Sequence, residues 1–92
     1  MSNFYITPEN VKSPKSRISG EIKVLKDGGP GSWSLVKLTW DNLESYGIRW
    51  NGSDDDNGIG NPQSRGVPTW FILPEEIGNL IEANLALFGS LS

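Results

Sequence analysis

The stretch ISGEIKVLKDGGPGSWSLVKLTW, residues 18–40, carries the clearest structural signal in this chain. Apolar and polar side chains alternate along residues 18–26, and they alternate again with the same period of two along residues 32–40. Such alternation is typical of strands that are buried on one face. The segment between them, Asp27-Gly-Gly-Pro-Gly31, is rich in residues that favour turns. The stretch therefore predicts an antiparallel hairpin.

Two further strands and a helix follow from similar patterns. Residues 46–50 alternate like a third strand, and residues 67–73 form a fourth strand that is apolar on both faces. The helix begins at Pro74-Glu-Glu76, because proline suits the first helical turn and glutamate favours the positive end of the helix dipole. We expect Gly78 to pack closely on the sheet, beside an apolar stripe in the core. The stripe consists of Ile77, Leu80, Ile81, Leu85 and Phe88.

A run of strands followed by a helix predicts an α+β fold. We expect a three- to four-stranded antiparallel β-meander with one C-terminal α-helix packed on a sheet face. The 92 residues are enough for a single domain. Its predicted parts are an N-terminal arm over 1–15 with a short edge strand at Phe4–Ile6, a sheet over 16–73 that contains a long loop at 51–66, and a helix over 74–89.

The composition excludes several kinds of chemistry. The chain has no cysteine and no histidine, which rules out disulfides, thiolate metal sites, cysteine nucleophiles and serine–histidine triads. No pair of carboxylates is positioned for acid–base work, so we expect no catalytic residues and no cofactor. The N-terminus lacks the pattern of a signal peptide, and no apolar run approaches the roughly 18 residues of a membrane span. We therefore expect a cytoplasmic protein that contacts no membrane.

The net charge of −3 is unevenly distributed. Residues 1–26 carry five basic side chains against two acidic ones, whereas residues 27–92 carry three against nine. The acidic body argues against binding to nucleic acid, in which phosphate neutralisation dominates affinity. A regulator that binds nucleic acid through the basic N-terminal third remains a third hypothesis, beside the interpretation as a solvated face. The basic side chains are Lys12, Lys15, Arg17, Lys23 and Lys26.

The loop over residues 51–66 is long for so small a domain, and loops of this length tend to be functional or disordered. Asn61 and Gln63 supply polar groups, and the planar guanidinium of Arg65 suits a carboxylate or a phosphate. We predict that these three side chains contact a partner or a small ligand. In the alternative interpretation, the loop bonds to its own backbone and Arg65 pairs with an aspartate of the Asp54–Asp56 run.

The aspartate run itself has a metal-binding interpretation. The segment Asp54-Asp-Asp-Asn-Gly58 contains part of a calcium-loop pattern, but it lacks the first aspartate and the bidentate glutamate. A solvated acidic turn explains the same residues. Adjacent aspartates can also hold magnesium for phosphoryl chemistry. The alternative function is thus a small metal-dependent phosphoester enzyme, with Asp54, Asp55 and Asp56 as candidate metal ligands.

The tryptophans suggest a second binding surface. We expect Trp40 and Trp50 to face the core with the helix, and Trp33 and Trp70 to lie on the opposite face with Arg49. Exposed tryptophan beside arginine is typical of interface hot spots. We therefore predict that Trp33, Arg49 and Trp70 join the loop residues in binding. In the alternative interpretation, the N-terminal arm covers these rings with the side chains of Phe4, Tyr5, Ile6 and Val11.

Two segments carry a family resemblance: GIRWNG at residues 47–52 and IGNPQSRGVPTWFILP at residues 59–74. They resemble small uncharacterised bacterial proteins of mobile gene cassettes, such as those of integron arrays, over about the C-terminal half of the chain. The resemblance implies a compact accessory protein that associates as a homodimer, and it supplies no catalytic residues. We therefore expect a non-catalytic binding or interaction module of a bacterial mobile element, which self-associates and binds a protein partner or a small ligand.

Overall fold

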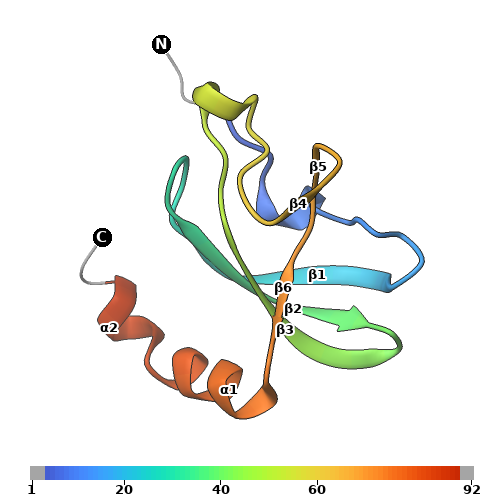
Figure 1. Cartoon of the computed structure of the whole chain (residues 1–92). Helices are drawn as coiled ribbons and strands as arrows, with labels where there is room; N and C mark the ends of the chain where they lie inside the picture. The colour runs from blue at the N-terminus through green and yellow to red at the C-terminus, as the bar shows by residue number, and fades with distance from the viewer. Residues whose placement is uncertain (1–3, 90–92) are drawn as a thin grey trace.

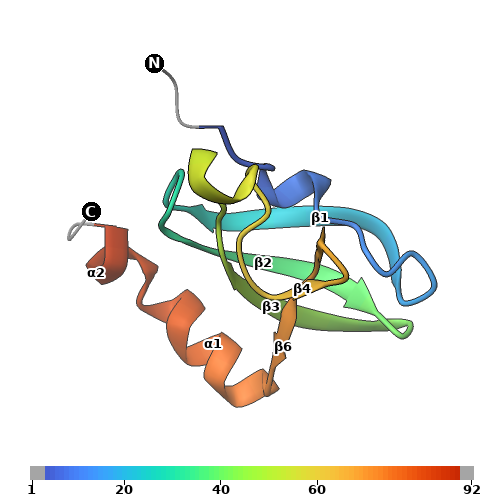
Figure 2. The ribbon, with the colours of Figure 1, turned by 45° about the horizontal axis from the view of Figure 1, so that its top comes forward.

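The computed structural model of the chain describes residues 4–89. A four-stranded antiparallel sheet has the N-terminal arm and the long loop on one side and the C-terminal helices on the other (Figure 1, Figure 2). The strand order is β1-β2-β3-β6. The strands are β1 (Ile18–Asp27), β2 (Trp33–Trp40), β3 (Leu43–Trp50) and β6 (Phe71–Leu73). The predicted α+β fold, an antiparallel sheet with a C-terminal helix packed on it, is confirmed.

A small polar network holds the glycine-rich turn between β1 and β2. The Asp27 carboxylate accepts hydrogen bonds from the Gly29 amide (3.0 Å) and from the Tyr5 hydroxyl (2.8 Å). Asn51 is buried, and it donates from its side chain to the Gly29 carbonyl (2.8 Å) and accepts from the Ser34 hydroxyl (2.9 Å). The network joins the arm, the turn and the start of the long loop, so it fixes where that loop leaves the sheet.

The turn between β2 and β3 is shorter than expected. Asp41 and Asn42 form it alone, with φ values of 51° and 68°, and β3 begins at Leu43 instead of Tyr46. Two successive residues with positive φ are the mark of a tight hairpin turn, whose twist matches that of its strands. Asp and Asn tolerate this conformation better than most residues do. The extra pairs lengthen the sheet and set the register between β2 and β3.

The predicted fourth strand is only partly correct. Val67 and Pro68 form β5, which pairs with β4 (Gln63–Ser64) in a separate two-stranded hairpin, and only residues 71–73 join the main sheet as β6. Proline has no amide hydrogen to donate to a sheet ladder, so it favours the end of the small hairpin. The main sheet therefore receives its fourth strand through β6 alone.

The N-terminal arm forms no edge strand at Phe4–Ile6, so that expectation is wrong. The arm instead contains a short 3-10 helix, η1 (Pro8–Asn10), and the Ile6 amide donates to the Gly58 carbonyl of the long loop (3.0 Å). The core of the protein lies where the arm crosses the sheet. Its buried side chains are Val11, Ile18, Ile22, Val36, Leu38 and Trp70.

The predicted C-terminal helix is divided. α1 (Glu75–Ala83) ends before Asn84, and α2 (Leu85–Gly89) follows. The Asn84 side chain donates to the Leu80 carbonyl (2.8 Å), a local bond of the kind by which asparagine competes with helical structure. Gly78 packs directly against the Tyr46 ring, as the sequence predicted, because a side-chain Cβ at this position would overlap the ring.

The apolar stripe of α1 does not lie in the core, which corrects the sequence prediction. Leu80 is 66% exposed and Ile77 is 45% exposed, while Ile81 and Leu85 are half-buried. The side chain of Phe88 lies outside the described part of the structure. The helix contacts the sheet mainly through Gly78 and the polar groups around it, so its apolar side chains are turned sideways along the sheet.

Candidate functional site

The register of the sheet places the tryptophans on other faces than the sequence predicts. Trp33 is the direct partner of Trp50 across β2 and β3, and the next pair on the same face joins Leu35 and Ile48. Trp33 and Trp50 therefore lie together on the helix side of the sheet, where Trp50 is 57% exposed. The expectation that Trp50 shares a sheet face with Trp40 is wrong. The expectation that Trp33 lies on the face away from the helix is also wrong.

Trp70 is buried beneath the N-terminal arm instead of exposed. Its indole Nε1 donates to the Val11 carbonyl (2.8 Å), and its ring lies over Gly47, where a Cβ would stand 3.1 Å from the ring. The alternative interpretation, in which the arm covers this ring, is therefore correct for Trp70. The ring closes the core and offers little surface to a partner.

Arg49 is a structural clamp for the long loop. Only 2% of its surface is exposed, and its guanidinium donates to three backbone carbonyls. Nη1 donates to the carbonyls of Pro62 (3.2 Å) and Thr69, and Nη2 donates to that of Ile59. A guanidinium suits this task because its donors are fixed in one plane. The expectation that Arg49 lies on an exposed binding face is wrong, because its guanidinium is buried and bonds to carbonyls inside the domain.

The surroundings of Arg49 also explain its charge state. Burial lowers the pKa of Arg49 to about 10, and the carboxylate of Asp56 opposes this shift. The guanidinium carbon lies 5.8 Å from the centre of the Trp70 ring, a cation–π distance. The Arg49 side chain therefore stays charged at neutral pH. The structure thus brings together two of the predicted site residues, Arg49 and Trp70.

The three predicted loop residues lie apart from Trp33. Asn61 pairs its backbone with Trp50 through bonds of 2.8 and 3.1 Å, which ties the loop to the end of β3. Gln63 and Arg65 are exposed on the β4–β5 hairpin, and Arg65 has a positive φ of 52° in its turn. The loop does bond to its own backbone, for example from Gln63 Nε2 to the Gly60 carbonyl (3.4 Å), but within residues 4–89 Arg65 forms no ion pair with the aspartates. The predicted residues thus form no single surface.

The aspartate run forms a short 3-10 helix, η2 (Asp54–Asp56), whose carboxylates bond to backbone amides. Asp56 accepts from the amides of Ser53 (2.9 Å) and Gly60 (2.8 Å), and Asp54 accepts from the amide of Phe4 (2.7 Å). The bonds that Asp56 accepts from backbone amides lower the pKa of its carboxyl group, and the bond from Ser53 has the largest effect. In the described part of the chain no three acidic side chains converge in an arrangement that could hold a metal ion. The run shapes the loop and anchors the arm.

The basic side chains of the N-terminal third are dispersed. Arg17 pairs with Asp41 at 2.6 Å, and Lys26 Nζ lies 4.8 Å from the centre of the Trp33 ring on the helix side of the sheet. Lys12 and Lys15 lie on the arm, beside the β4–β5 hairpin on the other side. These positions do not gather the basic charges into one surface.

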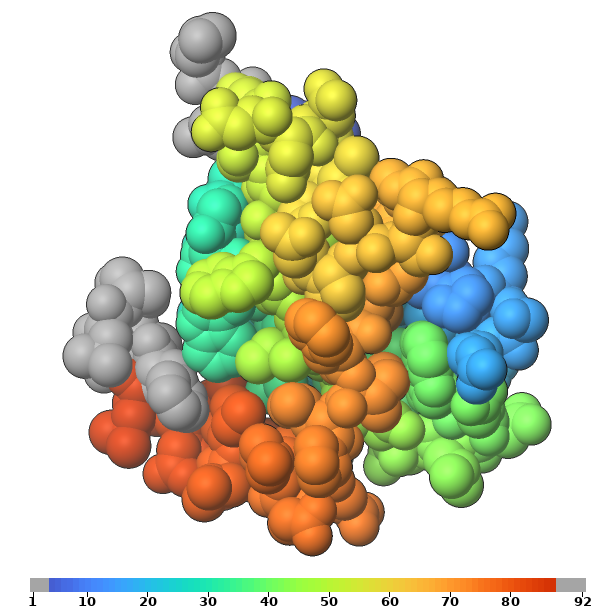
Figure 3. All heavy atoms as spheres, viewed as in Figure 1, coloured from blue at the N-terminus to red at the C-terminus, as the bar shows by residue number. Residues whose placement is uncertain are grey.

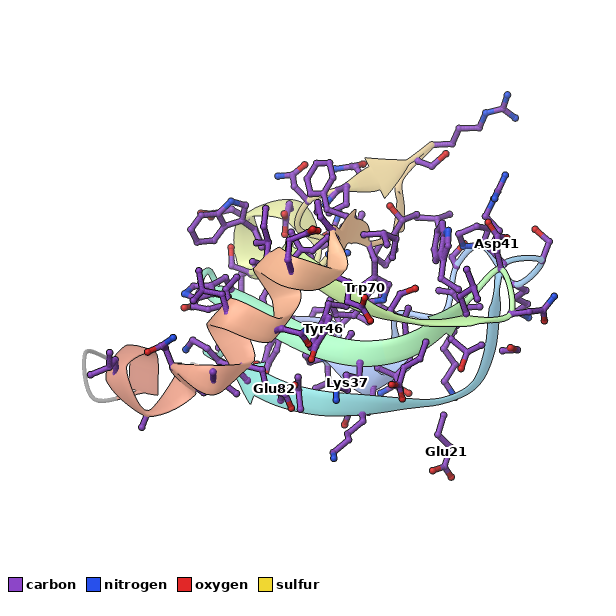
Figure 4. The ribbon with its side chains drawn as sticks, turned by 90° about the horizontal axis from the view of Figure 1, so that it is seen from below. Glu21, Lys37, Asp41, Tyr46, Trp70 and Glu82 are labelled. Carbon is purple, nitrogen blue, oxygen red and sulfur yellow. The ribbon has the colours of Figure 1, made fainter. Side chains whose placement is uncertain are left out.

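A polar cluster fastens α1 to the sheet (Figure 4). The Tyr46 hydroxyl bonds to Asn79 (2.8 Å) and to Glu82, and Lys37 Nζ lies 3.3 Å from the same Glu82 carboxylate. The bond with Glu82 raises the pKa of Tyr46, and the bond with Tyr46 lowers the pKa of Glu82. Both shifts favour the ordinary protonation states at neutral pH, so the cluster acts as a fastening and does not activate the tyrosine.

An open apolar groove of about 310 Å³ lies next to this fastening. Residues of β2, β3, β6 and α1 line the groove. Figure 3 shows all atoms of the molecule in the view of Figure 1. Phe71, 60% exposed, is the direct strand partner of Ile48. The residues that line the groove are Trp33, Ile48, Arg49, Trp50, Phe71 and Ile81. Large aromatic side chains therefore meet solvent on one concave surface.

Trp50, Phe71 and Ile81 line the groove, but they are not among the binding residues predicted from the sequence. The signal that would have placed Trp50 is the turn at Asp41–Asn42, because a two-residue turn fixes the register of its strands. That register pairs Trp33 with Trp50 directly. The orientation of α1, which turns Ile81 toward the groove, has no comparable signal in the sequence.

Comparisons of this chain with protein-family models, with curated proteins and with solved structures give no match. Within residues 4–89, none of the helices has the length and apolar character needed to cross a membrane.

Proposed function

We propose that this chain is a small, non-catalytic binding module that recognises apolar side chains of a protein partner in the groove between α1 and the sheet. The observation that carries the proposal is the exposure of Trp50 (57%) and Phe71 (60%) on the walls of one concave surface. Contiguous apolar patches on small proteins mark binding sites, and aromatic side chains dominate the binding energy of interfaces.

The way the groove is built supports this role. Strand pairing holds Trp33, Trp50 and Phe71 in fixed positions, so little conformational entropy is lost when a partner covers them. The Tyr46–Glu82 fastening holds α1 at one edge of the groove, where Ile81 lines it. A rigid apolar groove favours side chains that insert as a group.

The alternative enzyme gains no support from the site geometry, because the carboxylates of Asp54 and Asp56 are occupied by backbone amides. The accessory role in a bacterial mobile element and the cytoplasmic location stay predictions from the sequence.

Binding of a fluorescent apolar probe, anilinonaphthalene sulfonate, tests the proposal. The measurement uses a dilute sample of the folded chain, at a concentration where sedimentation gives the monomer mass. We expect probe fluorescence, with energy transfer from the groove tryptophans, and an at least fivefold weaker signal for Phe71→Ser. Leu43→Ser is the matched control, because Leu43 is 70% exposed and does not line the groove. Equal signals from both variants, or no binding to the wild type, would refute the proposal.

A further inference from the structure

The apolar side of α1 is turned sideways from the contact of the helix with the sheet, and part of it lines the groove. Residues three and four positions apart share a helix side, so Ile77, Leu80 and Ile81 form one apolar stripe. Gly78 contacts the Tyr46 ring, which fixes the rotation of the helix and directs this stripe to the side. Ile81 lines the groove, while Ile77 and Leu80 are exposed next to it. An amphipathic helix normally buries its apolar stripe, whereas Ile77 and Leu80 of this one are left uncovered by the described residues.

We propose that the cover is a second copy of this chain, in a two-fold dimer in which the α1 stripe of each copy packs into the groove of the other. This inference rests on the proposed function and names its partner. A two-fold interface is made by one surface that is complementary to itself. The groove with Trp50 and Phe71 and the ridge with Ile77 and Leu80 lie side by side on one surface, so a two-fold axis between them brings each ridge to the opposite groove.

The available area suits a small dimer. The exposed fractions of the groove and ridge side chains amount to on the order of 500 Å² of apolar surface per copy. A two-fold contact then buries roughly 1,000 Å² in total, which is near the lower limit for a specific interface. The side chains that contribute are Trp50, Phe71, Ile77 and Leu80. We therefore expect a reversible dimer that depends on concentration.

The charges also favour a second copy. α1 carries three glutamates and no basic residue, whereas Lys26 lies over the Trp33 ring at the groove. Packing α1 of one copy across the groove of the other brings acidic and basic groups together at the rim. Complementary charge at a rim directs docking and register. The Glu75–Glu76 end of α1 is the part expected to approach Lys26 of the other copy.

Sedimentation velocity over a wide concentration range is the first test. We expect the mean mass to rise from the 10.1 kDa of one chain toward twice that value. Leu80→Lys and Phe71→Glu are each expected to raise the dimer dissociation constant at least tenfold. Leu43→Lys is the control for a charge at an exposed leucine outside the groove. Circular dichroism and thermal unfolding verify that each variant is folded.

A mixing experiment then tests the reciprocal contact. In a dimer of Leu80→Lys with Phe71→Glu, one contact keeps both natural side chains and the other joins a lysine to a glutamate. We expect the mixture to form heterodimers, although neither variant dimerises alone. If dimerisation is unchanged in both variants, or if the mixture stays monomeric, the two-fold arrangement is wrong.

The probe assay distinguishes this inference from the proposed function. A wild-type chain that remains monomeric at millimolar concentration, but binds the probe in the groove, overturns the dimer and leaves a binding module for a different partner. A dimer that is insensitive to Leu80→Lys and Phe71→Glu, with no probe binding to the dilute monomer, overturns both.

Discussion

Replacing Arg49 by methionine tests whether the buried guanidinium stabilises the fold. The substitution keeps the length of the side chain but removes its donors, so three carbonyls lose their bonds. Three hydrogen bonds from a charged donor are worth about 4–5 kcal/mol at the low end of their range. The cation–π contact with Trp70 adds about 1 kcal/mol.

Burial of the charge acts in the opposite direction. Burial lowers the pKa of Arg49 from its ordinary value to about 10, which corresponds to roughly 3 kcal/mol of desolvation that the methionine variant escapes. The difference leaves Arg49→Met less stable by about 2–3 kcal/mol, a fall in Tm of roughly 8–24 °C for a domain of this size. The loss of the carbonyl bonds outweighs the relief of desolvation, because those carbonyls have no replacement donor.

Urea unfolding followed by tryptophan fluorescence measures this difference, and amide exchange of residues 59–61 reports the release of the loop. Arg65→Met is the matched control, since Arg65 is exposed, and we expect its stability to change by less than about 0.5 kcal/mol. If Arg49→Met is as stable as the wild type, desolvation outweighs the carbonyl bonds and the clamp interpretation fails. Arg49→Lys is expected to lose stability too, because one ammonium group cannot span three carbonyls.

Two further predictions concern the packing of α1 and the titration of the arm. Gly78→Ala gains about 1 kcal/mol of helix propensity, but the added Cβ overlaps the Tyr46 ring at an overpacking cost of about 1–3 kcal/mol. We therefore expect a net loss of stability, measured by urea unfolding. A gain in stability would show that α1 does not rest on this ring. Burial, followed by the bond to Asp27, raises the pKa of Tyr5 from 10.0 to about 12, so the folded chain holds a proton that the unfolded chain releases near pH 10. The stabilisation is therefore present below pH 10 and is lost as the pH rises toward 12. Phenolate absorbance should show the late titration, and Tyr5→Phe should remove that component; a Tyr5 titration near pH 10 would contradict it.

The proposed dimer and the helix orientation are linked. The fastening around Tyr46 holds α1 by polar groups and by one glycine, which leaves its apolar stripe exposed. If α1 instead packed its stripe on the sheet, Ile77 and Leu80 would be buried within one chain and the ridge of the proposed dimer would be lost. The proposed binding surface therefore depends on the rotation of the helix that the fastening fixes.

The strands were predictable because their signals are local. Alternation marked β1 and β2, and the glycine-rich segment marked the turn between them. The two-residue turn at Asp41–Asn42 was also present in the sequence, but its positive φ values belong to residues less typical of such turns than glycine. Without that turn the register was open, and the faces of Trp33 and Trp50 could not be assigned.

Local periodicity and composition were enough to establish the α+β class, the order of the strands and the exclusion of cysteine and histidine chemistry. They were not enough to show that Arg49 and Trp70 are buried while Trp50 and Phe71 are exposed, because burial depends on contacts between segments far apart in the chain. The arm covers Trp70, the loop carbonyls surround Arg49, and α1 leaves the groove open. None of these contacts has a periodic signal in the sequence, so each became visible only in the folded arrangement.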